Sequence, residues 1–408
     1  MAIPFPESGH YLDSIRSSSK NLRTANGIKI ERENILRLLR SPAFTESFQR
    51  VSANHGLAMP LNFASAADEL NLISVLSLLN FASGYRVPLH VETGRGAWDN
   101  IRAFVFGLYL SSSVGQEGDL LSAQGMQIIG EAKVAELMRV NVHVEAPHET
   151  IPGITVGTLG GPMHELVKLV TKTLNGTGKI LVDSGYPNLG HLVFQALKDG
   201  ASAKSGDRAD AEVDVILEKL VRALPAFQDM ALVDGTPVYC FKKALFLIHA
   251  VVVRFGSISP PPFPIPSTAH IPVFTDNVLP SMLIHLGVID VSSTPLAKHF
   301  PDIESRLEDL LARPPPTPAD IKKEPPAEGP ILTSDESYIL RTSAIDACEL
   351  IIEVARSLET SDTNTISAPA WVKEITLPDL DMWIWSVAKD RRDYRALQRF
   401  VLRDTVFF

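Results

Sequence analysis

The chain has 408 residues, with 38 lysines and arginines against 47 aspartates and glutamates and a net charge of −9. Apolar residues make up 45% of it and charged residues 21%, a globular balance that excludes a disordered or collagen-like chain. The acidic charge argues against a protein that binds duplex nucleic acid. It leaves room for a small phosphorylated ligand held by a few local Lys or Arg side chains.

The cysteine content and the apolar runs bear on where the protein works. Cys240 and Cys348 are too few for a disulfide framework or a four-cysteine zinc site, so we expect a reducing, cytoplasmic environment. The first residues have neither a basic start nor an apolar run, and we expect no signal peptide. The longest apolar stretch, 244–253, is shorter than the ~20 residues that cross a bilayer, so no membrane partner is expected.

Helical periodicity dominates the chain. Apolar residues recur at intervals of three and four, as on one face of a helix, and predict helices over 35–48, 70–81, 101–110, 134–140, 164–174, 213–224 and 303–311. Thr333 and Glu336 form a capping-box pattern that opens a further helix through Leu358. Strand-like alternation is confined to 87–91 and 238–241. The predicted fold is therefore mainly α, with at most a small sheet.

Two proline-rich segments interrupt the helical pattern. The segment 259–272 cannot form a helix, because each proline lacks a backbone donor and restricts the residue before it. The segment 313–330 is charged as well as proline-rich, which is typical of a solvated loop. Helical patterns resume unchanged after each segment, so we predict a single domain over 1–408 with proline-rich insertions.

Three motif-like segments do not meet the requirements of known sites. Residues 175–180 look like a phosphate-binding loop but lack its first glycine and its Ser or Thr, so we expect a turn there. Residues 143–149 hold two His and two Glu without the remaining parts of a deaminase or zinc-protease motif, and we expect a solvated loop and no metal site. The glycines of 157–161 follow no predicted strand, so no dinucleotide site is expected.

Asp381 is a candidate catalytic residue near the end of the chain. Three of the four tryptophans fall within 371–385, and on a helix Asp381 shares a face with Ile384 and Trp385. A carboxylate on such a face is costly to desolvate, so its pKa should rise, as in general acids and bases. Alternatively, Asp381 lies in a first helical turn after Pro378 and complements the helix dipole.

Asp276 is a second candidate, just after the first proline-rich segment. The simpler interpretation makes it an N-cap of the following helix, with Pro280 in the first turn. The other interpretation places its carboxylate at the edge of a pocket, with Phe274 beside it to stack on a planar ligand.

Lys242 and Lys243 open a predicted helix over 245–253. Positive charge at a helix start opposes the helix dipole, so a bound phosphate would explain their position. The alternative is a solvated pair at a helix end.

Taken in order, these motifs resemble the queuosine salvage family, the queuosine 5′-phosphate N-glycosylase/hydrolases. The matching segments are 79–81, Gly96 with Trp98, 174–181, 241–244, Phe274 with Asp276 and Pro280, 286–287, Arg341 with 349–351, and Asp381 with 384–385. Each motif alone is weak, and the specificity comes from their order and spacing. The resemblance covers residues 50–408.

The resemblance implies a fold similar to the helical DNA glycosylases and hydrolysis of the N-glycosidic bond of queuosine 5′-monophosphate. The released base, queuine, is then available for tRNA modification. No cofactor or metal is expected. By matching positions, Asp276 and Phe274 would contact the nucleotide, Lys242 would hold a polar or phosphate group, and Asp381 would complete the site. Lys243 and Trp385 are the remaining expected substrate-binding residues.

The chemistry suits these residue types. Cleavage of a ribosidic bond develops positive charge at C1′, which a carboxylate can stabilise, attack or supply with an activated water. Queuine is a 7-deazapurine without N7, so a second group must hydrogen-bond or protonate the base. We expect Asp276 at C1′ and Asp381 on the base, although the two roles could be exchanged. Phe274 would stack on the base, a contact worth ~1–3 kcal/mol.

The end of the chain departs from the family pattern. A basic stretch followed by two tyrosines is usual, whereas here 401–408 ends in Phe407 and Phe408 and the basic residues are mostly gone. Two alternatives therefore stay open beside the N-glycosidase. One is a catalytically impaired protein that binds a modified nucleotide, and the other is a helical interaction scaffold that docks through the proline-rich loop.

Overall fold

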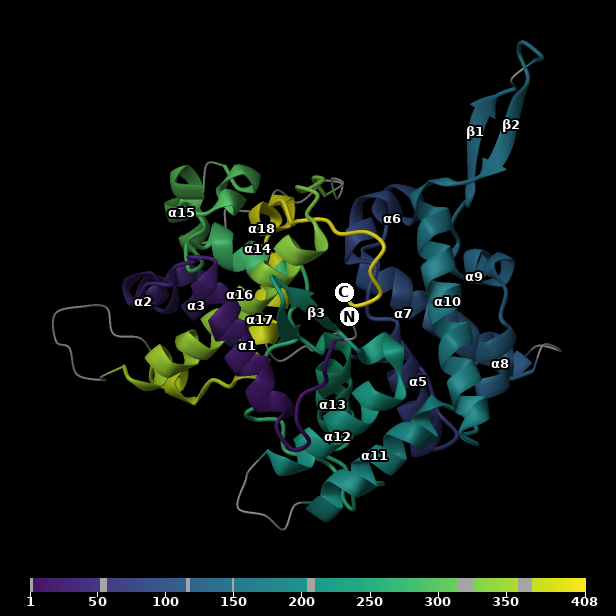
Figure 1. Cartoon of the computed structure of the whole chain (residues 1–408), viewed down its shortest axis with the longest axis horizontal. Helices are drawn as coiled ribbons and strands as arrows, with labels where there is room; N and C mark the ends of the chain where they lie inside the picture. Colours follow the sequence, from purple (N-terminus) through teal and green to yellow (C-terminus); the bar gives the residue numbers. More distant parts are fainter. Residues whose placement is uncertain are drawn as a thin grey trace.

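The computed structural model describes residues 3–51, 57–114, 118–148, 150–203, 210–301, 303–313, 326–358 and 369–408 (Figure 1). The fold is mainly α, as predicted, and its described strands form two separate two-stranded sheets. The buried apolar side chains form one continuous core. The predicted solvated loop over 313–330 falls largely on 314–325, outside the described residues.

The first half of the chain is built from helices that end in the long helix α10. They are α1 (Tyr11–Ala25), α2 (Arg32–Arg40), α3 (Pro42–Thr45), α4 (Phe48–Val51), α5 (Ala66–Leu78), η1 (Ser83–Tyr85), α6 (Arg86–Thr93), α7 (Ala97–Val114), α8 (Ala123–Ile128), α9 (Glu131–Met138) and α10 (Gly161–Asp183). In Figure 1, α5 to α10 lie together on the right side of the molecule.

The second half continues the α-rich pattern, and its longest helix is the buried α16. Its helices are α11 (Leu189–Ala203), α12 (Ala211–Ala223), η2 (Pro225–Phe227), α13 (Lys242–Phe255), α14 (Val278–His285), η3 (Pro295–His299), α15 (Ile303–Leu311), α16 (Ser334–Arg356), η4 (Ala370–Glu374), α17 (Leu377–Asp390) and α18 (Arg392–Ala396). Thr333 and Glu336 form the predicted capping box at the start of α16. As expected, the proline-rich segment 259–272 forms neither helix nor strand.

Two antiparallel hairpins account for the strands. β1 (His143–Pro147) pairs with β2 (Thr155–Leu159), and both strands are exposed along their whole length. Figure 1 shows this hairpin projecting from the body of the molecule. β3 (Met230–Val233) pairs with β4 (Thr236–Tyr239). Asp234 and Gly235 join them with positive φ angles, as a type I′ turn requires.

Four sequence-based predictions of secondary structure are wrong. Residues 87–91 lie in α6 rather than a strand, because Pro88 is tolerated in a first helical turn and no strand among the described residues pairs with them. The loop expected over 143–149 contains strand β1, which lacks alternation because it buries neither face. The helix expected over 35–48 is broken at Ser41 and Pro42. The turn expected over 175–180 lies inside α10.

Gly178 explains why α10 carries a loop-like motif. An added Cβ at Gly178 would lie 2.4 Å from the backbone nitrogen of Gln127 and 2.6 Å from the carbonyl oxygen of Ala123. Asn175 donates from Nδ2 to the carbonyl oxygens of Met126 and Ile129, at 2.9 and 3.0 Å, and so caps the end of α8. The motif is therefore a helix-packing signature, not a phosphate loop.

Membrane-spanning potential is limited in the part of the chain that the structure describes. No single helix there has the length and apolar character to cross a bilayer; the bent pair Ala66–Leu78 and Ser83–Thr93 reaches that threshold only when taken together.

Candidate functional site

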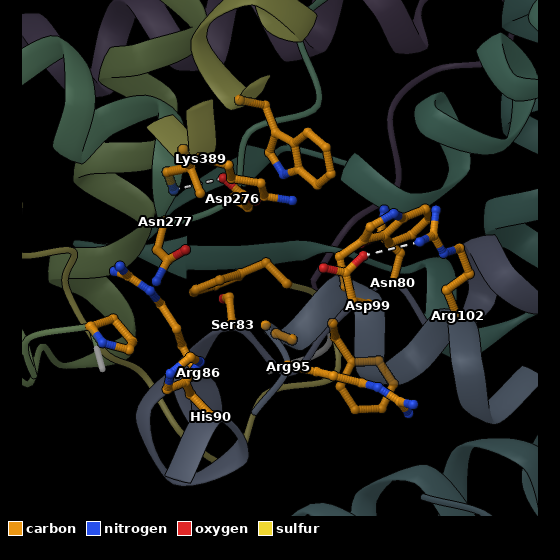
Figure 2. Close-up of a pocket in the computed structure, with 18 of the residues that line it drawn as sticks. Asn80, Ser83, Arg86, His90, Arg95, Asp99, Arg102, Asp276, Asn277 and Lys389 are labelled. Atoms are coloured by element: carbon orange, nitrogen blue, oxygen red, sulfur yellow. Dashed lines mark hydrogen bonds and ion pairs between the residues drawn. The ribbon is translucent and has the colours of Figure 1, made fainter. Parts of the chain in front are cut away.

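A cavity of about 580 Å³ lies between the helices α6 and α7 and the helix α17 (Figure 2). A smaller inner chamber of about 30 Å³ continues it toward the core. Five residues line both spaces, namely Asn80, Trp98, Lys242, Asp276 and Trp385. The structure therefore brings together residues from opposite ends of the sequence, since Asn80 and Trp385 are separated by roughly three quarters of the chain.

Aromatic rings form the walls of the inner chamber. The ring of Trp98 meets those of Phe246 and Trp385 edge to face, with centroids 5.6 and 6.0 Å apart. Phe246 in turn meets Phe274 edge to face at 6.0 Å. The indole Nε1 of Trp98 is buried and has no hydrogen-bond partner among the described residues. These walls suit a planar ligand.

Asp381 lies in the second turn of α17 and faces the inner chamber. Asp379, not Asp381, forms the capping box with Thr376, so complementing the helix dipole does not explain Asp381. Its side chain is buried, and its Oδ2 accepts a 2.6 Å hydrogen bond from the backbone N–H of Phe274. Burial raises the pKa of Asp381 to about 8, aided by the nearby charge of Asp276. The carboxyl group is thus largely protonated at neutral pH.

Asp276 lies in the loop before α14 and lines both the cavity and the inner chamber. Its Oδ1 accepts a 2.7 Å hydrogen bond from the backbone N–H of Val278, the first residue of α14. Asn277, not Asp276, is the N-cap residue of α14, so the N-cap interpretation of Asp276 is wrong. Its carboxylate instead accepts from the first amide of the helix and lines the cavity. Figure 2 shows it beside Asn277 and Lys389.

The two neighbouring lysines differ in their surroundings. Lys242 lines both spaces, and its Nζ donates to the backbone oxygen and Oδ1 of Asn80 at 2.6 and 3.1 Å. Burial lowers the pKa of Lys242 to about 8, although the charges of Asp276 and Asp381 oppose this. Lys243 lines neither space; its Nζ donates to the carbonyl oxygen of Leu78 at the end of α5. Both are buried, so the solvated pair is excluded.

The outer part of the cavity is rich in cationic side chains that sequence reasoning did not single out. They are Arg86, Arg95, Arg102, Lys389, Arg395 and Arg399, with His90 beside them. Arg102 pairs with Asp99. Figure 2 shows Arg86, His90 and Arg95 across the cavity from Asp276 and Lys389. They escaped notice because they come from two stretches, 86–102 and 389–399, that lie far apart in the sequence.

Arg86, Arg395 and Arg399 form a cluster of like charges at this outer end. None of the three is paired with a carboxylate in the described parts of the chain. Burial and the charges of the other two lower the pKa of Arg86 to about 9, and burial lowers that of Arg399 to about 10. The Nε of Arg399 is buried without a hydrogen-bond partner. Such a cluster favours a bound anion.

Among the described residues, no group of three or more His, Cys, Asp or Glu side chains is placed to hold a metal ion. Both cysteines are buried and free, and burial raises the pKa of the Cys240 thiol to about 12. The titratable groups that line the cavity and the inner chamber are the carboxyls of Asp99, Asp276 and Asp381, His90, two lysines and the arginines.

Residues 167–305 match the family model described as queuosine salvage protein. Lys242, Phe274 and Asp276 lie within the matched segment, whereas Asp381, Trp385 and Arg399 lie beyond it. No curated protein sequence matches the chain. The match over residues 167–305 confirms that this chain resembles the queuosine salvage family.

Proposed function

We propose that the protein hydrolyses the N-glycosidic bond of queuosine 5′-monophosphate, adding water to release queuine and ribose 5-phosphate. One observation carries this proposal: two carboxyl groups in different environments face one chamber with aromatic walls. Asp276 lines the cavity and the inner chamber, whereas Asp381 lines the inner chamber alone. A pair of carboxyls with separated pKa values can divide the roles of charge stabilisation and proton donation.

The base would occupy the inner chamber against Phe274, Trp98 and Trp385. The inner space is small as it stands, so the base would enter from the main cavity and share its volume. Asp381, held in its protonated form, would donate to the departing deazapurine, which lacks the N7 that other purines protonate. Asp276 would lie under C1′ of the ribose, where it stabilises the positive charge or activates water.

The 5′-phosphate would bind the cluster of Arg86, Arg395 and Arg399. These side chains line the cavity but not the inner chamber, so phosphate and base would lie at opposite ends of one ligand. A phosphate dianion would relieve the repulsion among the three guanidinium groups. Lys242, which the family resemblance gave to a polar or phosphate group, instead lies near the carboxyls.

The test is a chromatographic assay for free queuine. Purified protein is incubated with queuosine 5′-monophosphate, and the variants Asp276→Asn and Asp381→Asn are run beside it. Asp183→Asn, an exposed change at the end of α10, is the matched control. We expect release by the wild type and the control, and a loss of at least about 100-fold in each site variant.

The other outcomes separate the alternatives. Thermal stabilisation by the nucleotide without queuine release would replace the proposal with an impaired nucleotide-binding protein. Neither release nor stabilisation would favour an interaction scaffold and overturn the assignment of the cavity.

A further inference from the structure

Arg341 lies behind the candidate carboxylate and is fully buried in the middle of α16. Its Nε and Nη2 both donate to the carbonyl oxygen of Thr275, at 3.1 and 3.0 Å. That carbonyl belongs to the peptide that joins Thr275 to Asp276. The guanidinium therefore fixes the plane of the peptide from which the Asp276 side chain projects.

Arg341 is in turn fixed by a buried partner. Its Nη1 and Nη2 donate to the two carboxylate oxygens of Asp229 at 2.9 and 2.5 Å, and the hydroxyl of Tyr338 donates to Oδ1 of Asp229 at 3.0 Å. Oδ2 of Asp229 also accepts from the backbone N–H of Lys242. Because the bidentate ion pair of Arg341 and Asp229 is fully buried, the two side chains are fixed in one arrangement. Asp229 thus connects the start of α13 to the loop of Asp276.

Phe408 covers the other side of Arg341. Its ring centroid lies 4.5 Å from Cζ of Arg341, and its side chain is only 1% exposed. Phe408 lines the cavity of the candidate site and also a second cavity of about 950 Å³, which Phe407 lines as well. The ring of Phe408 therefore stands between the second cavity and the guanidinium.

We propose that Arg341, covered by Phe408, is a positioning residue that holds the Thr275–Asp276 peptide and thereby aims the Asp276 carboxylate into the cavity. The role in turnover rests on the proposed function, whereas the ordering of the loop does not. An ion pair with Asp229 alone would need only Nη1 and Nη2. The hydrogen bond from Nε to the carbonyl oxygen of Thr275 is additional, because a buried ion pair with Asp229 does not require it. A shift of about 1 Å in a reacting group can cost about 100-fold in rate.

The test uses three variants of the full chain. Arg341→Lys keeps the charge beside Asp229 but cannot hold Asp229 and Thr275 together through a planar fork. Phe408→Ala uncovers the guanidinium without changing any charge. Phe407→Ala is the matched control, because it truncates the neighbouring ring, which lines only the second cavity.

Two readouts are taken for each variant. The first is the change in kcat and the change in KM, measured separately, for queuine release. We expect kcat to fall at least about tenfold in Phe408→Ala and about 100-fold in Arg341→Lys, with KM changed by less than about threefold. The second is amide hydrogen exchange over 273–281, where the N–H of Val278 is bonded to Asp276. Exchange should rise there in both variants and remain at the wild-type rate in Phe407→Ala.

The outcomes are separable. If the wild type releases no queuine, the proposed function fails, and hydrogen exchange alone decides whether Arg341 orders the loop. If Arg341→Lys does not fold, Phe408→Ala decides. Wild-type exchange over 273–281 in Phe408→Ala, or a rise spread evenly over the whole chain, would overturn the positioning role.

Discussion

The backbone N–H of Phe274 donates to Oδ2 of Asp381 across 2.6 Å, which ties the loop before α14 to the second turn of α17. This single contact brings the two candidate carboxyl residues to one chamber, because Asp276 follows Phe274 by two positions. It also leaves Oδ1 of Asp381 available to a ligand. Since a hydrogen bond from an amide favours the charged form, the raised pKa of Asp381 comes from burial in spite of this bond.

The first prediction concerns the pH dependence of turnover. If Asp381 acts as a proton donor, kcat falls as the pH rises through about 8, the pKa to which burial raises this group. Lys242 loses its charge in the same range, so the limb belongs to the coupled pair. Asp381→Asn should abolish the limb along with most of the rate, as measured by initial rates of queuine release across the neutral and alkaline range.

Lys242→Met supplies the control for this assignment. The charge of Lys242 lowers the pKa of Asp381, so its removal should move the limb to higher pH and leave its shape unchanged. Lys242 titrates in the same range, so a basic limb that persists in Asp381→Asn but is absent from Lys242→Met would belong to Lys242 and would contradict the role of Asp381 as the acid.

The second prediction concerns stability. Asp381 has a folded-state pKa of about 8, above its ordinary value of 3.8. Its contribution to stability is fully present below the unfolded pKa and is lost as the pH rises through the folded one, because the unfolded chain ionises first. Asp381→Asn does not titrate, so the free energy of unfolding of this variant should rise relative to that of the wild type between these limits, by up to roughly 6 kcal/mol. Urea unfolding at several pH values measures this, and a constant difference would contradict it.

The third prediction separates phosphate from base recognition. Arg399→Met and Arg86→Met should lower kcat/KM for queuosine 5′-monophosphate by about 10- to 100-fold, the worth of one charge-assisted hydrogen bond. Neither should change kcat/KM for the queuosine nucleoside, which has no phosphate. Arg37→Gln, which removes an arginine exposed beside Glu308, is the control. Equal losses with both substrates would place the phosphate elsewhere.

Part of this structure could be predicted from local sequence patterns. The mainly α fold, the capping box at Thr333 and the break at 259–272 follow from periodicity and proline chemistry, which act over a few residues. The helix over 87–91 and the exposed hairpin of β1 could not be predicted this way. In both, the deciding factor is whether a partner strand is present, and that is a property of the whole fold.

The residues of the candidate site also differ in whether the sequence could reveal them. Asp381 could be selected because an acidic residue on an aromatic helix face is costly to bury. The arginine cluster could not, since Arg86 lies some 300 positions from Arg395 and Arg399 and each looks like an ordinary surface residue. Asp229 was missed for a similar reason: its partner, Arg341, is 112 positions away. The prediction of a single domain over 1–408, and of a fold like the DNA glycosylases, stays a prediction.

The fourth prediction distinguishes the adjacent lysines. Lys242→Met should lower kcat by about 10- to 1,000-fold, because it removes a cation beside both carboxyls and frees Asn80 from its place in the cavity wall. Lys243→Met should leave kcat within about threefold, since Nζ of Lys243 faces the end of α5 and not the cavity. Comparable losses of kcat in the two variants would mean that both act through the packing of α13.

The fifth prediction tests whether the loop-like motif of α10 is a helix-packing device. Gly178→Ala would drive a Cβ against the backbone of α8, at 2.4 and 2.6 Å, and should cost about 1–3 kcal/mol of stability because backbone atoms cannot move aside cheaply. Gly176→Ala is the matched control on the same helix, with nothing within 4 Å of the added Cβ. It should stabilise the protein by roughly 0.5–1 kcal/mol, the helix propensity of Ala over Gly.

Thermal and urea unfolding of both variants decide the matter. Opposite signs for two glycines only two positions apart can arise only from the contact with α8, since helix propensity acts equally on both. If both substitutions stabilised the protein, α8 would not pack closely on α10, and the capping of α8 by Asn175 would lose its geometric basis.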